Sequence, residues 1–318
     1  METTATTGKN NLGYPGATAP GFKSAARLRG GKRSCFYKLS SLFPLNIYPQ
    51  EHSRVNRGRQ LNLYHLSSII YHLTMHRLLV PSETLSLARA ILPPAAARHL
   101  KVLRPKSGEQ IELFDGQGRM RTYACSADGL AAVGETRCVP PPSVRLTLFA
   151  CVTKGSRWDW TIEKAVELGV ARIVPVLSAR SIVRLSAAER PAKAERWRRI
   201  AEDAARQSDA AWLPEVWEAV DFPVALELVK ACRRVFVGAL AEPPPPPLWT
   251  ALADGVDKFV EGDSGLFVGP EGDFTPEELA SLVAIATPVS FGPTVLRAET
   301  AAIFGLSVLA AASHVRPR

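Results

Sequence analysis

The chain has 318 residues and is 46% hydrophobic, which suits a globular protein of two ordinary domains or of one large domain with a tail. No apolar run reaches the roughly 18 residues of a membrane-spanning helix, and even the apolar segment 301–312 is too short. These properties exclude a helical membrane protein, and we expect a soluble one.

The formal net charge of +9 is unevenly distributed. Residues 1–74 hold ten Lys/Arg and two Asp/Glu, which gives +8, whereas residues 75–318 hold 29 and 28, which gives +1. If the body of the chain binds nucleic acid, it must therefore use a local patch of Arg and Lys.

Residues 1–74 lack sustained apolar periodicity, so we expect disorder. Two interpretations remain open for this basic extension. It is an organellar transit peptide, or it is upstream sequence translated because the start was placed too early. The internal Met75, followed by HRLLV, favours the second. The cytoplasm is then the expected location, with an organelle as the alternative.

Residues 75–143 show short segments separated by Gly and Asp turns, which predict a small β-rich barrel. Strands are expected at 78–80 and in QIELFDG and RTYACSA, with a helix over 95–103. The triple proline 140–142 continues neither a strand nor a helix. It predicts a stiff linker to a second domain.

Residues 144–318 alternate between apolar strands and helices, which predicts an α/β sheet that is largely parallel. Ligands on such sheets bind in loops at the carboxyl ends of strands. Strands are expected at 145–152, 172–177, 233–240, 265–270 and 288–292, and helices at 158–168 and 196–206, after Pro276 and from Ala298.

The segment GLFVGPEGDFTPEEL (265–279) leads from a strand through a Gly-rich loop into a helix. Gly269 and Gly272 allow close approach of the backbone to a ligand, although a strand-to-helix turn needs such glycines for geometry alone. Thr275, Pro276 and Glu278 predict a capped helix start.

The segment FGPTVLRAETAA (291–302) repeats this design after the next strand. Arg297, beside a helix start, suits a phosphate or carboxylate, because its guanidinium donates two parallel hydrogen bonds. The alternative is an ion pair of Arg297 with Glu299 or Glu271 that only fixes the loop.

Two further segments carry candidate RNA contacts. In KGSRWDWTIEKAVELGV (154–170), Lys154 and Arg157 are placed to face a polyanion, whereas Glu163 and Glu167 beside Lys164 are typical of a solvated helix face. In ERWRRIAEDAARQS (195–208), several arginines accompany Trp197, a combination that suits phosphate pairing and base stacking.

Several chemistries lack support. The sequence contains no Walker loop, dinucleotide fingerprint, GxSxG or HExxH motif. The five cysteines (Cys35, Cys125, Cys138, Cys151 and Cys232) form no metal-binding spacing. They predict reduced, mostly buried thiols and no metal site.

Taken together, these segments resemble the RsmE-type family of 16S ribosomal RNA uracil-N3 methyltransferases, of the SPOUT superfamily. The resemblance covers residues 75 to about 314 and includes MHRLLV and RHLKVLR (98–104). It implies a PUA-like RNA-binding barrel over 75–143 and, over 144–318, a SPOUT domain with a trefoil knot, which the usual chain-path rules would not suggest. It also implies S-adenosylmethionine as cofactor, small-subunit ribosomal RNA as partner, and a homodimer.

Carried over by position, the resemblance implies three cofactor loops: 237–240, 268–272 and 291–297. The expected cofactor-binding residues are Val237, Gly238, Leu240, Val268, Gly269, Pro270, Glu271, Gly272, Phe291, Gly292, Val295, Leu296 and Arg297. The expected RNA-binding residues are His99, Arg104, Lys154, Arg157, Arg198 and Arg206.

Two positions depart from the family pattern. Asp273 stands where the family commonly has a second glycine after GPEG, and Asp209 and Ala210 stand where it commonly has an arginine. The second change is expected to remove one RNA contact.

Methylation at uracil N3 requires loss of the N3 proton and stabilisation of the developing anion. We expect Arg297 to hold the substrate or its charge, and Glu299 or Glu271 to accept the proton. Two alternatives remain: a SPOUT methyltransferase acting on transfer RNA or ribose 2′-OH, and a ribosomal-RNA-binding protein without catalysis.

Overall fold

The computed structural model describes residues 75–253 and 262–313, so the expectations for residues 1–74 and Cys35 lie outside the described residues. None of the helices in these ranges is long and apolar enough to span a membrane. The N-terminal elements are β1 (His76–Leu79), the 3-10 helix η2 (Ser82–Ser86), β2 (Arg89–Ala90), α2 (Pro94–Leu103), β3 (Gln110–Phe114), β4 (Arg119–Ser126) and β5 (Gly129–Cys138).

The remaining elements form the second domain. They are β6 (Val144–Cys151), α3 (Ser156–Glu167), β7 (Arg172–Leu177), α4 (Arg190–Gln207), β8 (Glu215–Val216), β9 (Val220–Asp221), α5 (Phe222–Val229), β10 (Arg234–Gly238), α6 (Leu248–Ala253), β11 (Gly262–Val268), α7 (Pro276–Val283), β12 (Thr287–Val289) and α8 (Ala298–Ser313).

The N-terminal β domain is a five-stranded sheet in the order β1-β3-β4-β5-β2, curled into a half-barrel. Strands β1 and β3 are parallel, and the other neighbours are antiparallel. Leu78, Leu113 and Tyr123 are buried in its core, and the Tyr123 hydroxyl donates to the Thr84 and Leu87 carbonyls. The β-rich prediction is confirmed, with the difference that the sheet curls only partway around.

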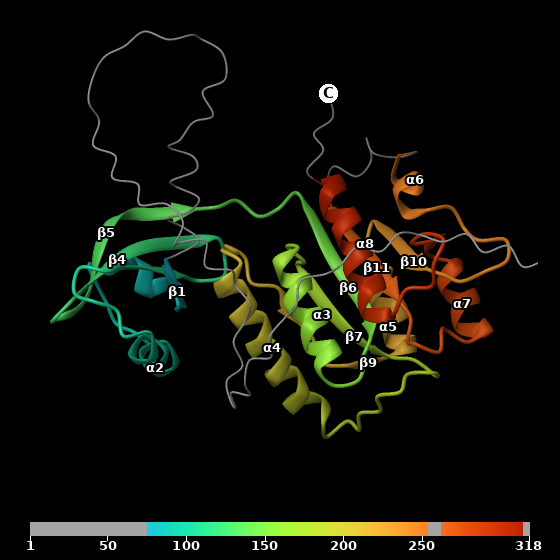
Figure 1. Ribbon diagram of the computed structural model, residues 1–318, viewed down its shortest axis with the longest axis horizontal. Coiled ribbons are helices and arrows are strands. Elements are labelled where there is room, and N and C mark those ends of the chain that lie inside the picture. The colour runs from blue at the N-terminus through green and yellow to red at the C-terminus, as the bar shows by residue number, and fades with distance from the viewer. Residues whose placement is uncertain (1–74, 254–261, 314–318) are drawn as a thin grey trace, which may run out of the picture. The chain divides into compact units, whose positions relative to one another are not determined.

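The second domain is built on a parallel sheet in the order β12-β10-β11-β6-β7-β8, with β9 also pairing with β7. Side chains of successive strand residues point to opposite faces. In β6, Leu146 and Leu148 belong to the core cluster beneath α3, α4 and α8, whereas Phe149 and Cys151 belong to the cluster beneath α5 and α7. Helices thus cover both faces, as Figure 1 shows, and most residues of β6, β7, β10 and β11 are buried.

The strand order brings three loops to one edge of this sheet. Val237 of β10 pairs with Phe267 of β11, and Gly238 pairs with Val289 of β12. Because the strands are parallel, the loops that follow them leave from the same edge. The chain then returns from β12, at the end of the sheet, to α8, which packs against β6 and β11 near the middle. The knot implied by the family stays a prediction.

The cysteine prediction is partly wrong. Of the four cysteines in the described ranges, all free thiols, only Cys151 is buried, and Cys138 is exposed. Cys138 ends β5, where the strand leaves the sheet for the linker, so a period-two pattern gives it no core position.

Candidate functional site

The loops after β10 and β12 are held together by contact of an aromatic ring with a glycine. A Cβ atom built on Gly238 would lie 2.4 Å from the ring of Phe291, far inside van der Waals contact. The Phe291 ring packs in turn against Phe304 of α8, with ring centroids 6.0 Å apart. Gly238 is therefore required for close packing, because only a residue without Cβ fits beneath the ring.

The loop after β11 contains a tight turn in which the Asp273 amide donates to the Pro270 carbonyl at 3.0 Å. Asp273 has a left-handed backbone, with φ of 59°. Glycine adopts this conformation freely and Asp tolerates it, which explains how Asp replaces the family's usual glycine. The predicted capping box of Thr275 and Glu278 is present at the start of α7.

Arg180 fixes the same loop from a neighbouring strand end. Its guanidinium donates to the carbonyls of Gly272 and Phe274, at 3.2 Å each. Arg180 lies outside every motif identified in the sequence. Its position just after β7 was the available indication, since β7 ends at the same edge of the sheet.

Arg157, at the start of α3, lies between two carboxylates of the candidate site. Its Nη1 is 3.4 Å from Oε1 of Glu271, and its Nε is 3.9 Å from Oε1 of Glu299. The suggested alternative, an ion pair of Arg297 with one of these carboxylates, is wrong, because Arg157 occupies that place. Arg297 is exposed and has no ion pair among the described residues.

Glu299 is an unusual residue for its surroundings. It lies in the first turn of α8 and is only 9% exposed. Its Oε2 atom is buried and has no hydrogen-bond partner within the described ranges. A helix N-terminus stabilises a carboxylate, but an unpaired buried oxygen is costly. The Glu299 carboxylate is therefore a candidate to bind a polar group of a ligand or to exchange a proton with it.

The structure brings the predicted cofactor residues together, because all of them lie on the three loops or at the strand ends that precede them. Two of these residues, Leu240 and Val295, expose apolar side chains. The edge of the sheet therefore combines exposed backbone at Gly272, exposed apolar side chains, the buried carboxylate of Glu299 and three exposed guanidiniums, those of Arg157, Arg180 and Arg297.

The predicted RNA-binding residues fall into two groups. Lys154 and Arg157 lie beside the loops described above, whereas His99 and Arg104 of the β domain lie on or directly after α2. His99 is close enough to Arg206 of α4 for the two to interact electrostatically. Burial first, and Arg206 second, lower the pKa of His99. Arg198 is partly occupied, because its Nε donates to the Val216 carbonyl.

The suggestion that Trp197 stacks on RNA is wrong. Trp197 is only 3% exposed and packs edge-on against Trp158 of α3, with ring centroids 5.7 Å apart. It lies on the helix face that includes Ala194 and Ala201, both buried against the sheet. The arginines of α4 pair instead with acidic neighbours: Arg196 with Asp159, and Arg206 with Asp203.

Lys164 confirms the solvated-face interpretation of its helix, since its ammonium contacts Glu163 at 2.8 Å and Glu167 at 2.7 Å. These hydrogen bonds raise the pKa of Lys164. Among residues 75–253 and 262–313, no three His, Cys, Asp or Glu side chains gather as metal ligands would.

Comparison with known proteins matches residues 140–310 to the model of an RNA methyltransferase domain family. The chain is 32% identical to ribosomal RNA small subunit methyltransferase E of Mycobacterium bovis over 219 residues, which are 65% of this chain and 80% of the relative. It is 29% identical to the Bacillus subtilis protein of the same name, over 66% of this chain and 84% of the relative.

Solved structures agree with the sequence comparison. The crystal structure of ribosomal RNA small subunit methyltransferase E from Neisseria gonorrhoeae, bound to S-adenosylmethionine, superposes with a TM-score of 0.62 and 28% identity. That match covers 73% of this chain and 95% of the Neisseria chain. The chain therefore belongs to the SPOUT-class RNA methyltransferase family that includes ribosomal RNA small subunit methyltransferase E.

Proposed function

We propose that this protein transfers the methyl group of S-adenosylmethionine to N3 of a uracil in 16S ribosomal RNA of the small subunit. The observation that carries the proposal is the match to ribosomal RNA small subunit methyltransferase E over four fifths of the relative's length. Arg157 contacts Glu271 in the loop after β11 and Glu299 at the start of α8, at the edge of the sheet where this fold binds ligands.

The residues at the sheet edge fit a nucleoside cofactor. Gly272 is exposed and leaves backbone that a ligand can approach closely, whereas Gly269 packs against the Phe274 ring. Leu240 and Val295 offer apolar surface for an adenine ring. A relative from Neisseria gonorrhoeae was solved bound to S-adenosylmethionine, which supports the same assignment for this chain. The cofactor's sulfonium supplies an electrophilic methyl group when bound.

The reaction needs a proton acceptor for the N3–H group of uracil. Methylation at N3 would release the N3–H proton, which would pass to a carboxylate of this chain. We assign the acceptor role to Glu299 in preference to Glu271, because Glu299 holds a buried oxygen without a partner in the described ranges. Arg157 keeps a positive charge beside both carboxylates.

Arg297 is assigned to the substrate. Its guanidinium is exposed and has no ion pair within the described part of the chain, so it is available to a uracil oxygen or a phosphate. Donation to the uracil O2 or O4 atom stabilises the anion that develops as the proton leaves.

We assign RNA binding to both domains, and we place the boundary between the two domains at residues 143/144. Arg104 and His99 of the β domain, and Lys154 and Arg157 of the SPOUT domain, form its proposed contacts. Arg206 and Arg198 are set aside, because Arg206 pairs with Asp203 and Arg198 donates to the Val216 carbonyl.

The homodimer and the cytoplasmic location belong to the same proposal. Trp160 of α3 exposes a large apolar side chain, and α3 contacts α8. A second copy is the occupant that we assign to this surface. The organellar alternative depends on residues 1–74, which lie outside the described residues.

Calorimetry with S-adenosylmethionine, followed by transfer of labelled methyl groups to small subunits from cells lacking this gene, tests the proposal. We expect binding and label in the RNA for the wild type, and binding without appreciable label for Arg297→Ala. Failure of the wild type to bind the cofactor would favour an RNA-binding protein without catalysis. An Arg297→Ala protein with normal turnover would refute the role of Arg297.

A further inference from the structure

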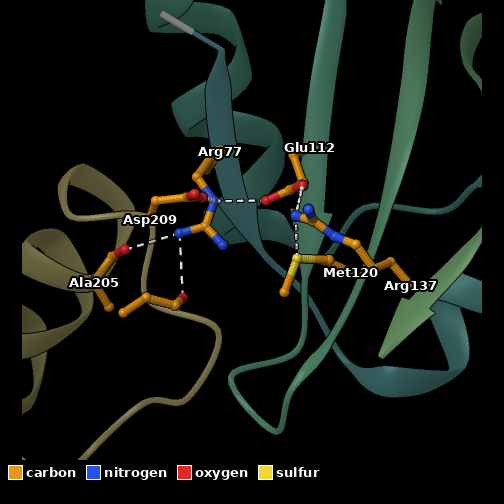
Figure 2. Close-up of polar contacts among 7 residues, drawn as sticks. Arg77, Glu112, Met120, Arg137, Ala205 and Asp209 are labelled. Atoms are coloured by element: carbon orange, nitrogen blue, oxygen red, sulfur yellow. Dashed lines mark hydrogen bonds and ion pairs between the residues drawn. The ribbon is translucent and has the colours of Figure 1, made fainter. Parts of the chain in front are cut away.

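Arg77, in β1, is a buried arginine that lies between the two domains. Figure 2 shows its guanidinium directed between β3 and the end of α4. On the β-domain side, its Nε donates to Oε1 of Glu112 at 2.8 Å, and its guanidinium carbon lies 4.2 Å from the centre of the Phe114 ring. Both Arg77 and Glu112 have side chains that are 3% exposed.

The other side of the same guanidinium holds the end of α4. Its Nη1 donates to the carbonyls of Ala205 at 2.9 Å and Ala210 at 3.2 Å, and its Nε lies 3.2 Å from Oδ1 of Asp209 (Figure 2). Ala205 and Ala210 lie 128 and 133 positions after Arg77, in and just after α4 of the second domain. These contacts therefore join the two domains.

Asp209 is one of the two departures from the family pattern, and the structure shows what its side chain does. The residue has a left-handed backbone, with φ of 57°, which ends α4 and directs the carboxylate at Arg77. Together with Arg137, which lies 3.1 Å from Glu112, the cluster holds two guanidiniums and two carboxylates. The charges of the cluster therefore balance, with Arg77 and Glu112 buried and the Asp209 and Arg137 side chains 40% and 50% exposed.

The segment that follows Asp209 is docked on the β domain by its backbone. The Gly118 amide donates to the Ala211 carbonyl at 3.0 Å, and the Leu213 amide donates to the Gly116 carbonyl at 2.8 Å. A Cβ atom on Gly118 would lie 2.7 Å from the Trp212 ring, so this approach requires glycine. The domains are thus joined by a second, noncovalent connection besides the proline linker.

We infer that Arg77 and Asp209 are positioning residues that lock the RNA-binding surface of the β domain to the methyl-transfer site. This inference rests on the proposed function. If RNA is held by both domains, a rigid connection makes the second contact intramolecular. A loose connection would let RNA bind the β domain without presenting its uracil to the SPOUT domain. Weakening the connection should therefore raise KM for the small ribosomal subunit.

Two substitutions at Asp209 distinguish the effect of its carboxylate contact with Arg77 from the effect of backbone strain. Asp209→Gly removes the carboxylate but keeps a residue that accepts φ of 57°. Asp209→Asn keeps an oxygen that can accept from Arg77 and also tolerates this conformation. Glu227→Gln is the matched control, since it neutralises an exposed carboxylate on α5 whose ion pair is with Lys230, three residues along the same helix end.

The experiment measures hydrogen exchange of the Gly118 and Leu213 amides, S-adenosylmethionine affinity, and KM and kcat on small subunits. For Asp209→Gly we expect faster exchange at both amides, KM raised about fivefold or more, and cofactor affinity and kcat within about twofold of wild type. Asp209→Asn should recover most of the loss, and Glu227→Gln should match the wild type.

Two outcomes would overturn the inference. Unchanged exchange of the Gly118 and Leu213 amides in Asp209→Gly would show that the Arg77–Asp209 contact does not hold the two domains together. Faster exchange with unchanged KM would show that RNA positioning does not use it. If the wild type transfers no methyl group, the proposed function fails, whereas the exchange measurement still decides whether Arg77 and Asp209 join the domains.

Discussion

Gly238 offers the sharpest test of how the candidate site is packed. In the substitution Gly238→Ala, the new methyl group would start 2.4 Å from the Phe291 ring. Carbon atoms pack at about 3.5–4.0 Å, so the ring must move by roughly 1 Å or more. Overpacking of this kind typically costs about 1–3 kcal/mol. Gly238 and Phe291 both belong to the proposed cofactor loops, so this cost should reduce cofactor binding.

If the whole cost falls on binding, S-adenosylmethionine affinity decreases about 5- to 150-fold. Calorimetry measures the affinity, and thermal unfolding measures any share that falls on stability. The matched control is Gly265→Ala in β11, where the nearest atom would lie 3.3 Å away, so we expect cofactor affinity close to wild type.

A double-mutant cycle that combines Gly238→Ala with Phe291→Leu isolates the contact. The smaller leucine side chain leaves room for the added methyl group, so the two substitutions together should cost at least about 1 kcal/mol less than the sum of their separate costs. If Gly238→Ala binds the cofactor as tightly as wild type and unfolds at the same temperature, the Gly238–Phe291 contact does not shape the site.

Three further predictions follow from single side chains. Arg157→Ala should lower the rate of methyl transfer about tenfold or more in single-turnover assays, because Glu299 and Glu271 lose the cation that they share. The ion pairs of Arg157 are half-exposed, so their loss should cost less than about 1 kcal/mol of stability. Normal turnover of the Arg157→Ala protein would contradict this role. Trp197→Ala should cost about 3–5 kcal/mol in urea unfolding, because its ring is buried, and a selective loss of RNA affinity without destabilisation would instead support stacking. Burial raises the pKa of Cys151 to about 11, so peptide mapping at pH 8 should find Cys138 alkylated and Cys151 protected, and rapid Cys151 alkylation would refute this assignment.

The parallel sheet could be predicted because its strands are buried on both faces and read as apolar runs. The strand over 172–177 matches the structure at both ends. The two-residue strands β8 and β9 were missed, since so short a segment carries no periodicity. Helix α5 was missed as well, because it is short and its apolar residues show no clear polar face.

The site loops were found from their glycines and prolines, whereas the partners of their charged residues were not. Arg157 reaches Glu271 across 114 positions, and no local pattern carries such a contact. The burial of Trp197 can be predicted from the sequence. Its spacing from Ala194 and Ala201 repeats at three and four residues, which places the ring on the buried face of α4.

The central claim is methylation of uracil N3 in small-subunit ribosomal RNA. The most direct test incubates the protein and labelled S-adenosylmethionine with small subunits from cells lacking this gene, digests the RNA, and identifies the labelled nucleoside by mass spectrometry. We predict label in 3-methyluridine, with Glu299→Gln much slower than wild type. Label in a 2′-O-methylated nucleoside, or no label with competent subunits, would contradict the claim.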